Sequence, residues 1–371
     1  MPVSWILLAL LLVLVMGGYL YILFRRFFSL FPPLAHSRVR LWLPILPAAA
    51  IALLCADVFF QRFMVLVHFL VVALLVELLG LLMRRLRKHK IWDFLYNSSL
   101  LSLLICGIYL LYGFVNIHHV VNTTYTLESD KLSSPVKIAF ISDLHMGTTM
   151  DVDELRTYCE QIEEQDVDMV LLGGDMVDES TTLTQHQGMA DAFGSIESRY
   201  GTYYVFGNHD SFSGDDEDPS TDGAVVNRRA LTQAFADSGI TILEDSSVLL
   251  EGGIRLVGRA DISYYQDRER ASLDELLQGA DPSEYIILID HQPMEQANVA
   301  AKGVDLMLSG HTHGGQLWPG RLLNELMNSY DQVYGEKTVD GMNAIVSSGM
   351  GGWNYQFRTG SHSEIVYITI E

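Results

Sequence analysis

The chain has 371 residues, enough for two domains of ordinary size, and its charge is divided unevenly between two parts. Residues 1–125 carry a formal charge of +7, whereas residues 126–371 carry −28. An acidic part of this kind repels polyanions, so nucleic acid is not an expected partner. The three cysteines show no paired spacing and predict neither a disulfide framework nor a thiolate zinc site.

Four apolar runs predict an α-helical transmembrane region in residues 1–120, with about four helices. The runs cover residues 4–24, 41–60, 63–83 and 94–115. Each is close to the ~20 residues that a helix needs to cross a bilayer. Pro44 and Pro47 are expected to kink the start of the second run. We therefore predict a multi-pass integral protein of the cell membrane, with the lipid bilayer as a partner.

Basic residues predict the orientation of these helices. The links after the first and third runs hold nine of the ten basic residues of this part, and the link after the second holds only Arg62. The positive-inside rule places the two basic links in the cytoplasm, so the acidic part is predicted to be extracytoplasmic. Glu77 and His68 lie within the third run. They are either functional intramembrane groups or, as we favour, polar contacts inside a helix bundle.

Residues 121–135 are polar and are expected to form a linker, whereas residues 136–371 alternate between the patterns of strands and helices. This alternation predicts an α/β domain with an antiparallel part late in the chain. Strands are expected at 136–141, 169–172, 203–206, 240–243, 247–250, 254–258, 285–289, 306–308, 344–347 and 365–370. Helices are expected at 152–165, 189–198, 228–238 and 271–277. The acid-rich stretch 214–222 favours a solvated loop over a calcium site, because its spacing is not that of an EF-hand loop.

Aspartate, asparagine and histidine follow five of the predicted strands, most of them beside a glycine. The first pair, Asp143 and His145, is two residues apart, so both side chains point the same way from an extended strand end. Similar positions are held by Asp175 and Asp178, by Asn208 and His209, by His291, and by His311 and His313. Each motif alone is weak evidence, but five in this order predict a metal site. Oxygen and imidazole ligands without thiolate favour Mn, Fe or Zn.

From residue 136 to its end the chain resembles the calcineurin-like metallophosphoesterase superfamily. The five blocks of that superfamily, D-x-H, GD-x-x-D, GNH-D/E, H and GH-x-H, all occur here in order. The forms GGDMVD and GHTHGGQ most resemble its bacterial membrane-associated branch. The resemblance implies a four-layer α-β-β-α sandwich over residues 136–371 that holds two divalent metal ions.

The resemblance also assigns roles by position. It implies one metal held by Asp143, His145, Asp175 and His313, and a second held by Asp175, Asn208, His291 and His311. Asp175 would bridge the two ions, which would lie ~4 Å apart and activate a water for attack on phosphorus. His209 would act on the leaving oxygen as a general acid, oriented by Asp178. For Arg358 two roles stay open, a contact with the substrate or an ion pair with the acidic surface.

These observations predict a membrane-anchored dinuclear phosphoesterase. Its substrates would be phosphomonoesters, phosphodiesters or pyrophosphates, with lipid-linked and cell-envelope intermediates among the candidates. Glu179 and Ser180 stand where protein phosphatases of this superfamily carry an arginine that grips phosphate, which argues against phosphoproteins. The main alternative is a catalytically silent sensor or binding protein with the same fold, which a missing ligand would favour. A transporter with an appended domain is the third class, and the oligomeric state is left open.

Overall fold

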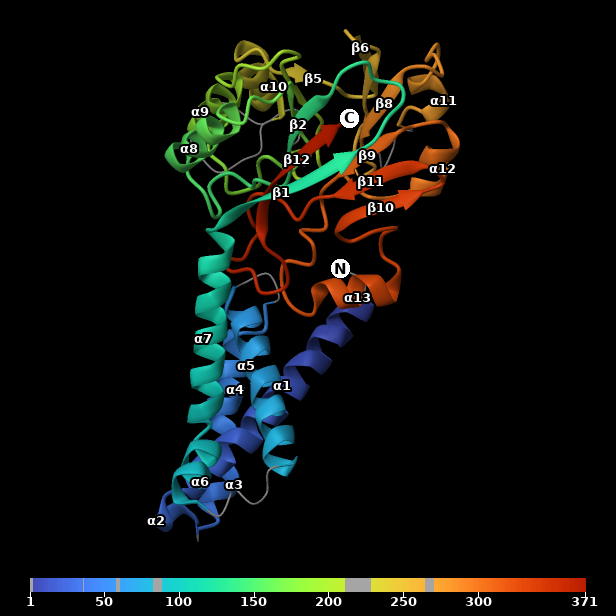
Figure 1. The fold of residues 1–371 in the computed structure, drawn as a ribbon. Coiled ribbons are helices and arrows are strands. Elements are labelled where there is room, and N and C mark those ends of the chain that lie inside the picture. Colours follow the sequence, from blue (N-terminus) through green and yellow to red (C-terminus); the bar gives the residue numbers. More distant parts are fainter. Residues whose placement is uncertain (1–2, 36, 58–60, 83–88, 211–227, 264–269) are drawn as a thin grey trace. The chain divides into compact units, whose positions relative to one another are not determined.

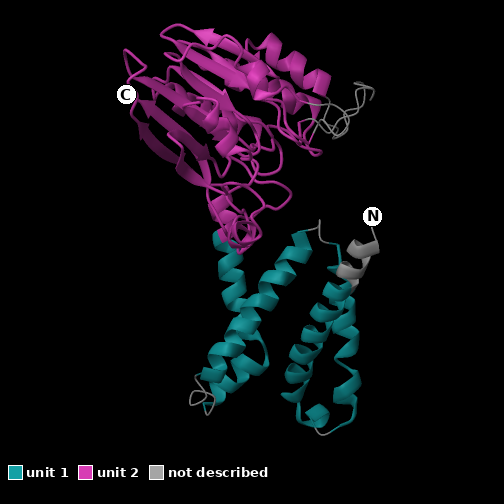
Figure 2. Cartoon of the chain, turned by 90° about the vertical axis from the view of Figure 1, so that its right-hand side faces the viewer, with its two compact units in different colours: residues 1–112 teal, residues 113–371 magenta. Residues whose placement is uncertain are grey.

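The chain forms two compact units in a computed structural model (Figure 2). Unit 1 covers Met1–Tyr112 and unit 2 covers Gly113–Glu371. The structure describes residues 3–35, 37–57, 61–82, 89–210, 228–263 and 270–371. The acid-rich stretch 214–222 lies outside the described residues.

Unit 1 consists of helices. These are α1 (Val3–Ser29), α2 (Pro32–Ala35), α3 (Val39–Trp42), α4 (Ile45–Leu54), α5 (Gln61–Leu82), α6 (Lys90–Asn97) and α7 (Leu100–Ile117), and the last turn of α7 belongs to unit 2. Within the described residues, three helical segments are long and apolar enough to cross a membrane, namely Leu11–Ser29, Gln61–Leu82 and Leu100–Ile117.

The second predicted run does not form one helix of spanning length among the described residues, so long helices correspond to three of the four predicted runs. The second run is divided between α3 and α4, with Pro44 at the N-cap of α4. Helix α4 has 10 residues and is therefore about 15 Å long, whereas the hydrocarbon core is ~30 Å thick. Pro44 thus marks the interruption between α3 and α4, whereas Pro47 lies inside α4.

The polar residues of the third run make contacts inside unit 1. Glu77 forms an ion pair of 2.7 Å with Arg26 and accepts a hydrogen bond of 2.9 Å from the Tyr19 hydroxyl. His68 Nδ1 lies 2.7 Å from the Met64 carbonyl oxygen, one turn earlier in the same helix. These contacts agree with the preferred interpretation of polar contacts in a bundle. The Arg26–Glu77 pair also brings the C-terminal ends of α1 and α5 together.

Unit 2 contains two six-stranded sheets (Figure 1). The first has the order β1-β12-β2-β3-β4-β5, with bounds Val120–Leu127, Ser363–Ile370, Val136–Ile141, Met169–Leu172, Thr202–Tyr204 and Thr241–Ile242. The second has the order β10-β11-β9-β8-β7-β6, with bounds Gly335–Val339, Met342–Val346, Leu306–Ser309, Tyr285–Ile289, Ile254–Gly258 and Ser246–Leu250. The β12–β2, β10–β11 and β6–β7 pairs are antiparallel, and the other neighbours are parallel.

The two sheets pack face to face and helices cover their outer faces, which confirms the predicted four layers. Alternate residues of a strand point to opposite faces, so Phe140 joins the core between the sheets and Ile141 joins the outer core. The outer core of the first sheet includes residues of α8 (Val152–Glu163), α9 (Leu183–Gly194) and α10 (Arg228–Asp237). The second sheet packs on α11 (Leu273–Leu276) and α12 (Gln296–Ala301).

The expected linker at 121–135 contains a strand. β1 pairs in parallel with β12 along its eight residues, from Val120↔Ser363 to Leu127↔Ile370. One face of β1 is exposed and rich in threonine and asparagine, which is why its sequence resembles a linker. Three further elements of unit 2 were not predicted: β10, α12 and α13 (Gly320–Met327).

Hydrogen bonds to Glu364 join β12 to β1 and to the segments around Tyr334 and Ser348. Its buried carboxylate accepts hydrogen bonds from the Ser348 N–H at 2.8 Å, the Tyr334 hydroxyl at 3.1 Å and the Thr123 hydroxyl of β1. Burial alone would raise the pKa of Glu364, but the hydrogen bonds from His362, Thr123 and Ser348 outweigh it and lower the pKa to about 2. Because the folded pKa is depressed, this carboxylate stabilises the fold above its usual pKa of ~4.3, and the contribution is lost as pH falls toward 2.

Glu364→Gln is therefore expected to lower the free energy of unfolding at pH 7 by about 1–3 kcal/mol, because buried donors lose a charged acceptor. It should also flatten the decline in stability between pH ~4 and 2. Urea unfolding of the full chain in detergent measures both effects. Glu160→Gln, on the exposed side of α8, is the matched control. Equal stability losses in the two variants would contradict the role given to Glu364.

Candidate metal centre

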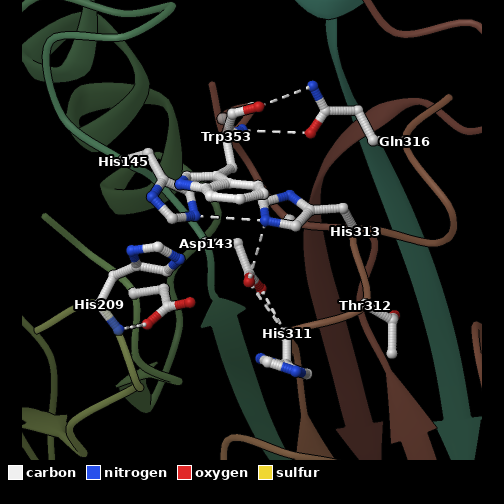
Figure 3. Close-up of polar contacts among 12 residues, drawn as sticks. Asp143, His145, His209, His311, Thr312, His313, Gln316 and Trp353 are labelled. Atoms are coloured by element: carbon white, nitrogen blue, oxygen red, sulfur yellow. Dashed lines mark hydrogen bonds and ion pairs between the residues drawn. The ribbon is translucent and has the colours of Figure 1, made fainter. Parts of the chain in front are cut away.

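The predicted site residues all follow strands of unit 2 at their carboxyl ends. In the first sheet, Asp143 follows β2, Asp175 follows β3 and Asn208 comes after β4. In the second sheet, His291 follows β8 and His311 follows β9. Within each sheet these strands are parallel, so their carboxyl ends share one edge. The two edges meet, because the carboxylate of Asp143 accepts the backbone N–H of His311 at 2.9 and 3.0 Å (Figure 3).

Two groups of three side chains are arranged so that each could hold a metal ion. The groups are Asp143, His145 and His313, and Asp175, His291 and His311, and within each the ligand atoms lie within 4.8 Å of one another. In the first, the Nε2 atoms of His145 and His313 face each other at 3.2 Å (Figure 3). In the second, His291 Nε2 lies 3.0 Å from Asp175 Oδ2. Six of the seven predicted ligands thus fall into these two groups, with Asp175 in the second group only.

Atoms without partners support metal binding at these groups. The side-chain oxygen of Asn208, the seventh predicted ligand, is buried and has no hydrogen-bond partner among the described residues. His311 Nδ1 is also buried and without a hydrogen-bond partner among the described residues. The other ring nitrogen of His311, Nε2, lies 3.0 Å from the Tyr330 hydroxyl. Buried polar atoms are normally paired, so these oxygen and nitrogen atoms fit a divalent cation as the missing partner.

A hydrogen bond at Nδ1 fixes the ring orientation of His291. Its Nδ1 lies 2.8 Å from the Gly173 carbonyl oxygen, which can only accept a hydrogen bond. Nδ1 therefore carries the proton and Nε2, which faces Asp175, is left as the ligand atom. Burial raises the pKa of Asp175, but while His291 is protonated its charge and the hydrogen bond from Nε2 hold that pKa well below its usual range; a bound cation would take the place of that proton at Nε2. Burial lowers the pKa of His311 to about 3, with a further contribution from the charge of His291.

The backbone at these strand ends is strained. Five of the seven predicted ligands have a left-handed backbone, with φ of 51° at Asp143, 45° at His145, 52° at Asp175, 68° at His311 and 50° at His313. For residues other than glycine this conformation costs on the order of 1–3 kcal/mol each, and it concentrates at functional sites. Gly310 is needed beside them, because a Cβ at that position would collide with the Asp143 carboxylate.

Asp210 is a structural residue of the site that the sequence analysis left without a role. Its buried carboxylate accepts backbone N–H groups of Asp175 at 2.6 Å, Met176 at 2.9 Å, Val177 at 3.1 Å and Gly207 at 2.7 Å. One side chain thereby joins the loops that follow β3 and β4. The available signal was the acidic residue that closes the GNHD motif.

The contacts found for Asp178 and for His209 are with other residues than the predicted pairing gives. Asp178 Oδ2 lies 3.3 Å from Nδ1 of the ligand His145 and accepts a hydrogen bond of 2.9 Å from Thr148. His209 Nδ1 lies 3.3 Å from Glu179 Oε1 instead. Asp178 and Glu179 are neighbours in the chain, and the hydrogen bonds to Asp178 from Thr148 and from the Ser180 N–H turn its carboxylate toward His145.

Arg358 has neither of the two roles considered for it. Its side chain is fully buried, and its guanidinium donates to the backbone carbonyls of Ser348 at 2.7 Å, of His362 and of Gly351. Burial lowers the pKa of Arg358 to about 10. The residue therefore holds the segment before β12 in place and does not reach a substrate or a surface acid.

A pocket of about 280 Å³ lies beside the histidines. It is lined by His311, Thr312, His313, Gly315, Gln316, Leu317, Gly320, Asn324, Tyr330, Trp353 and Tyr355. The Gln316 amide fixes the backbone of Trp353 through hydrogen bonds of 3.1 and 3.2 Å (Figure 3). His311 and His313, both candidate metal ligands, thus line a cavity with three aromatic side chains.

The two sheets thus meet at a cluster of carboxylate and imidazole side chains. A family profile described as calcineurin-like phosphoesterase matches residues 136–315, so this part of unit 2 is a domain of that type. A Helicobacter pylori protein named "uncharacterized metallophosphoesterase" is 33% identical over 244 residues, 65% of this chain and 61% of that protein. The chain thus matches less than two thirds of that relative's length.

Two further proteins are similar to parts of this chain. A zebrafish (Danio rerio) protein named "transmembrane protein with metallophosphoesterase domain" is 27% identical over 327 residues, 83% of this chain and 71% of that protein. The crystal structure of a Thermus thermophilus protein covers 58% of this chain and 92% of its own, with 10% identity and a TM-score of 0.39.

The contacts of Asp178 and Glu179 predict different effects of two neighbouring substitutions. Asp178→Asn should lower metal affinity about 10- to 100-fold, because Asp178 supports the ligand His145. Glu179→Gln should leave metal binding unchanged, because Glu179 contacts His209. Metal content after dialysis against graded chelator concentrations tests both. Equal metal loss in the two variants, or loss only in Glu179→Gln, would refute the assignment.

Proposed function

We propose that this chain is a membrane-anchored, dinuclear, metal-dependent phosphoesterase that hydrolyses phosphomonoester, phosphodiester or pyrophosphate bonds. The two ligand groups beside the aromatic pocket are the observation that carries this proposal. The match of residues 136–315 to the phosphoesterase profile supports the same reaction class. A silent sensor is not favoured, because all seven predicted ligand positions hold a residue able to bind a metal.

The chain's residues suit two divalent ions of Mn, Fe or Zn. Asp143, His145 and His313 would hold the first, and His291, His311 and Asn208 the second, with Asp175 shared between them. When bound, two such ions supply an activated water and neutralise charge on the phosphoryl oxygens.

His209 is proposed to protonate the leaving oxygen. Glu179 at Nδ1 holds the imidazole, and the Trp353 ring lies 5.1 Å away, centroid to centroid. The backbone N–H of His209 donates to Asp175 Oδ1 at 2.7 Å, which ties the acid to the metal site. A positioned imidazole of this kind contributes roughly 10²–10⁴ in rate.

The pocket lining indicates which substrates fit. Among its described lining residues there is no lysine or arginine, so phosphate charge would be met chiefly by the metal ions. Tyr330, Trp353 and Tyr355 offer ring faces to an uncharged organic group. Together with Glu179 in place of a phosphate-gripping arginine, this lining supports small diesters, pyrophosphates or lipid-linked phosphates over phosphoproteins and nucleic acid.

The proposed membrane arrangement is multi-pass, with unit 2 outside the cytoplasm. Basic residues concentrate at the end of α1 and in the link that follows it, and again after α5. The Arg26–Glu77 ion pair supports a common side for these two helix ends. The chain must then return between α1 and α5, through residues 30–60, although α4 alone is too short to span.

Substitution of Asp175 and of His209 should give different outcomes. Asp175→Ala is expected to lose metal, because it removes the carboxylate shared by both ions. His209→Ala should keep both metals and lose about 10²–10⁴ in turnover, with a smaller loss for aryl esters whose leaving group needs no proton. Mass-spectrometric metal content and turnover on esters of graded leaving-group pKa test this. Metal loss in His209→Ala equal to that in Asp175→Ala would make His209 a ligand.

The orientation is tested by labelling in a chain whose native cysteines are replaced. Glu251→Cys, on the exposed turn between β6 and β7, should react with an impermeant maleimide in intact cells. Ser37→Cys, in the basic link after α1, should react only after lysis. The opposite pattern would reverse the proposed orientation.

A further inference from the structure

Helix α13 exposes an apolar face next to the candidate pocket. None of its residues is buried, and Leu322, Leu323, Leu326 and Met327 are 52%, 49%, 70% and 74% exposed. Trp318, just before the helix, is 46% exposed. The side that lines the pocket carries Gly320 and the polar Asn324 instead. A surface helix of a soluble domain turns its apolar side inward, so α13 has the reverse arrangement.

This apolar face is unusual within unit 2. Among the described residues of unit 2, the other exposed large apolar side chains are Phe114 and Val115 of α7 and the isolated Leu249 and Ile262. A grouped apolar surface of this kind marks a contact with a partner or a membrane. The two exposed residues of α7 lie in its last turn, at the end of a candidate membrane span.

Hydrogen bonds within unit 2 fasten α13 to that last turn of α7. The Arg358 N–H donates to the Gly113 carbonyl at 2.9 Å, and the Asn116 amide donates to the Arg358 and Ser361 carbonyls at 2.9 and 2.7 Å. In the same segment, Thr359 Oγ1 accepts the Trp318 N–H at 3.1 Å. Residues 358–361 therefore connect the end of α7 directly to the start of α13.

We propose that α13 and Trp318 lie in the interfacial layer of the bilayer and form the membrane-side rim of the pocket. The bilayer is the occupant because hydrogen bonds through residues 358–361 tie the start of α13 to the end of α7, which is the end of a candidate membrane span. Leucine and methionine side chains on one face, with tryptophan at the edge, suit this layer. The Arg321–Glu325 pair, 2.8 Å apart, stays on the polar part of the helix.

The same helix both contacts lipid and lines the pocket, which points to a substrate class. A phosphate ester carried on a lipid tail could bring its headgroup past Gly320 and Asn324 to the metal ligands while its tail remains in the bilayer. This second step rests on the proposed phosphoesterase function, whereas the bilayer contact does not.

The bilayer contact is tested without any enzymatic readout. Spin labels are placed at Leu326→Cys and, as a matched exposed apolar control, at Leu249→Cys, in the full chain reconstituted into phosphatidylcholine vesicles. The Leu326 label is expected to be reached by dissolved oxygen and shielded from a water-soluble nickel complex, and the Leu249 label should show the reverse. Equal nickel access at both positions would overturn the proposal. Shielding of Leu326 from both reagents would mean that a second copy covers α13, and would overturn it as well.

The substrate class is tested by a ratio of rates. Diacylglycerol pyrophosphate in the same vesicles is compared with a water-soluble aryl phosphate ester, in a Leu322→Asp/Leu326→Asp variant and in Leu249→Asp. The ratio of lipid to soluble turnover should fall about tenfold or more in the double variant only. An unchanged ratio would refute the lipid substrate. Turnover of neither substrate by the unaltered chain would refute the phosphoesterase function, and the spin-label result would still decide the bilayer contact.

Discussion

The contact between the Asp143 carboxylate and the His311 backbone joins the two sheets at the point where the site forms. Asp143 follows a strand of the first sheet and His311 a strand of the second, and the His291–Gly173 contact repeats the connection in the other direction. Each ligand group draws on both sheets, so neither sheet alone contains a complete group. The packed core between the sheets therefore sets the distances between ligands, and its rigidity is transmitted to them.

Hydrogen bonds at the site offset part of the conformational cost of its backbone. Left-handed backbone at five ligand positions is unfavourable in isolation, and closely placed imidazole nitrogens leave unsatisfied polar atoms. Asp210 offsets part of this cost, because one carboxylate accepts four N–H groups from two neighbouring loops. Cations bound to the folded state alone would add further stability by mass action.

Much of the site could be predicted from sequence, and the omissions have physical causes. Strands β2, β3, β8 and β9 are buried on both faces, so they are almost entirely apolar runs, with Lys137 of β2 as one exception, and a predicted metal ligand follows each of them. The Asp178 and Glu179 roles could not be separated, because adjacent carboxylates diverge according to local hydrogen bonds and not according to spacing. Helix α13 was missed because its apolar face has no protein core to pack on. The helix in the second run was predicted too long, because composition alone does not show that α4 begins after Pro44 and ends at Leu54.

The place of β12 in the first sheet has a consequence for biosynthesis. β12 lies between β1 and β2 in space, yet it follows every other described element along the chain. β1 is an edge strand of the first sheet and its pairing partner is β12. During synthesis β1 therefore has no partner strand until more than two hundred further residues have been added. An apolar strand left unpaired for that long would invite association with other chains. The threonines and asparagine that make β1 look like a linker are the side chains that keep such a waiting strand soluble.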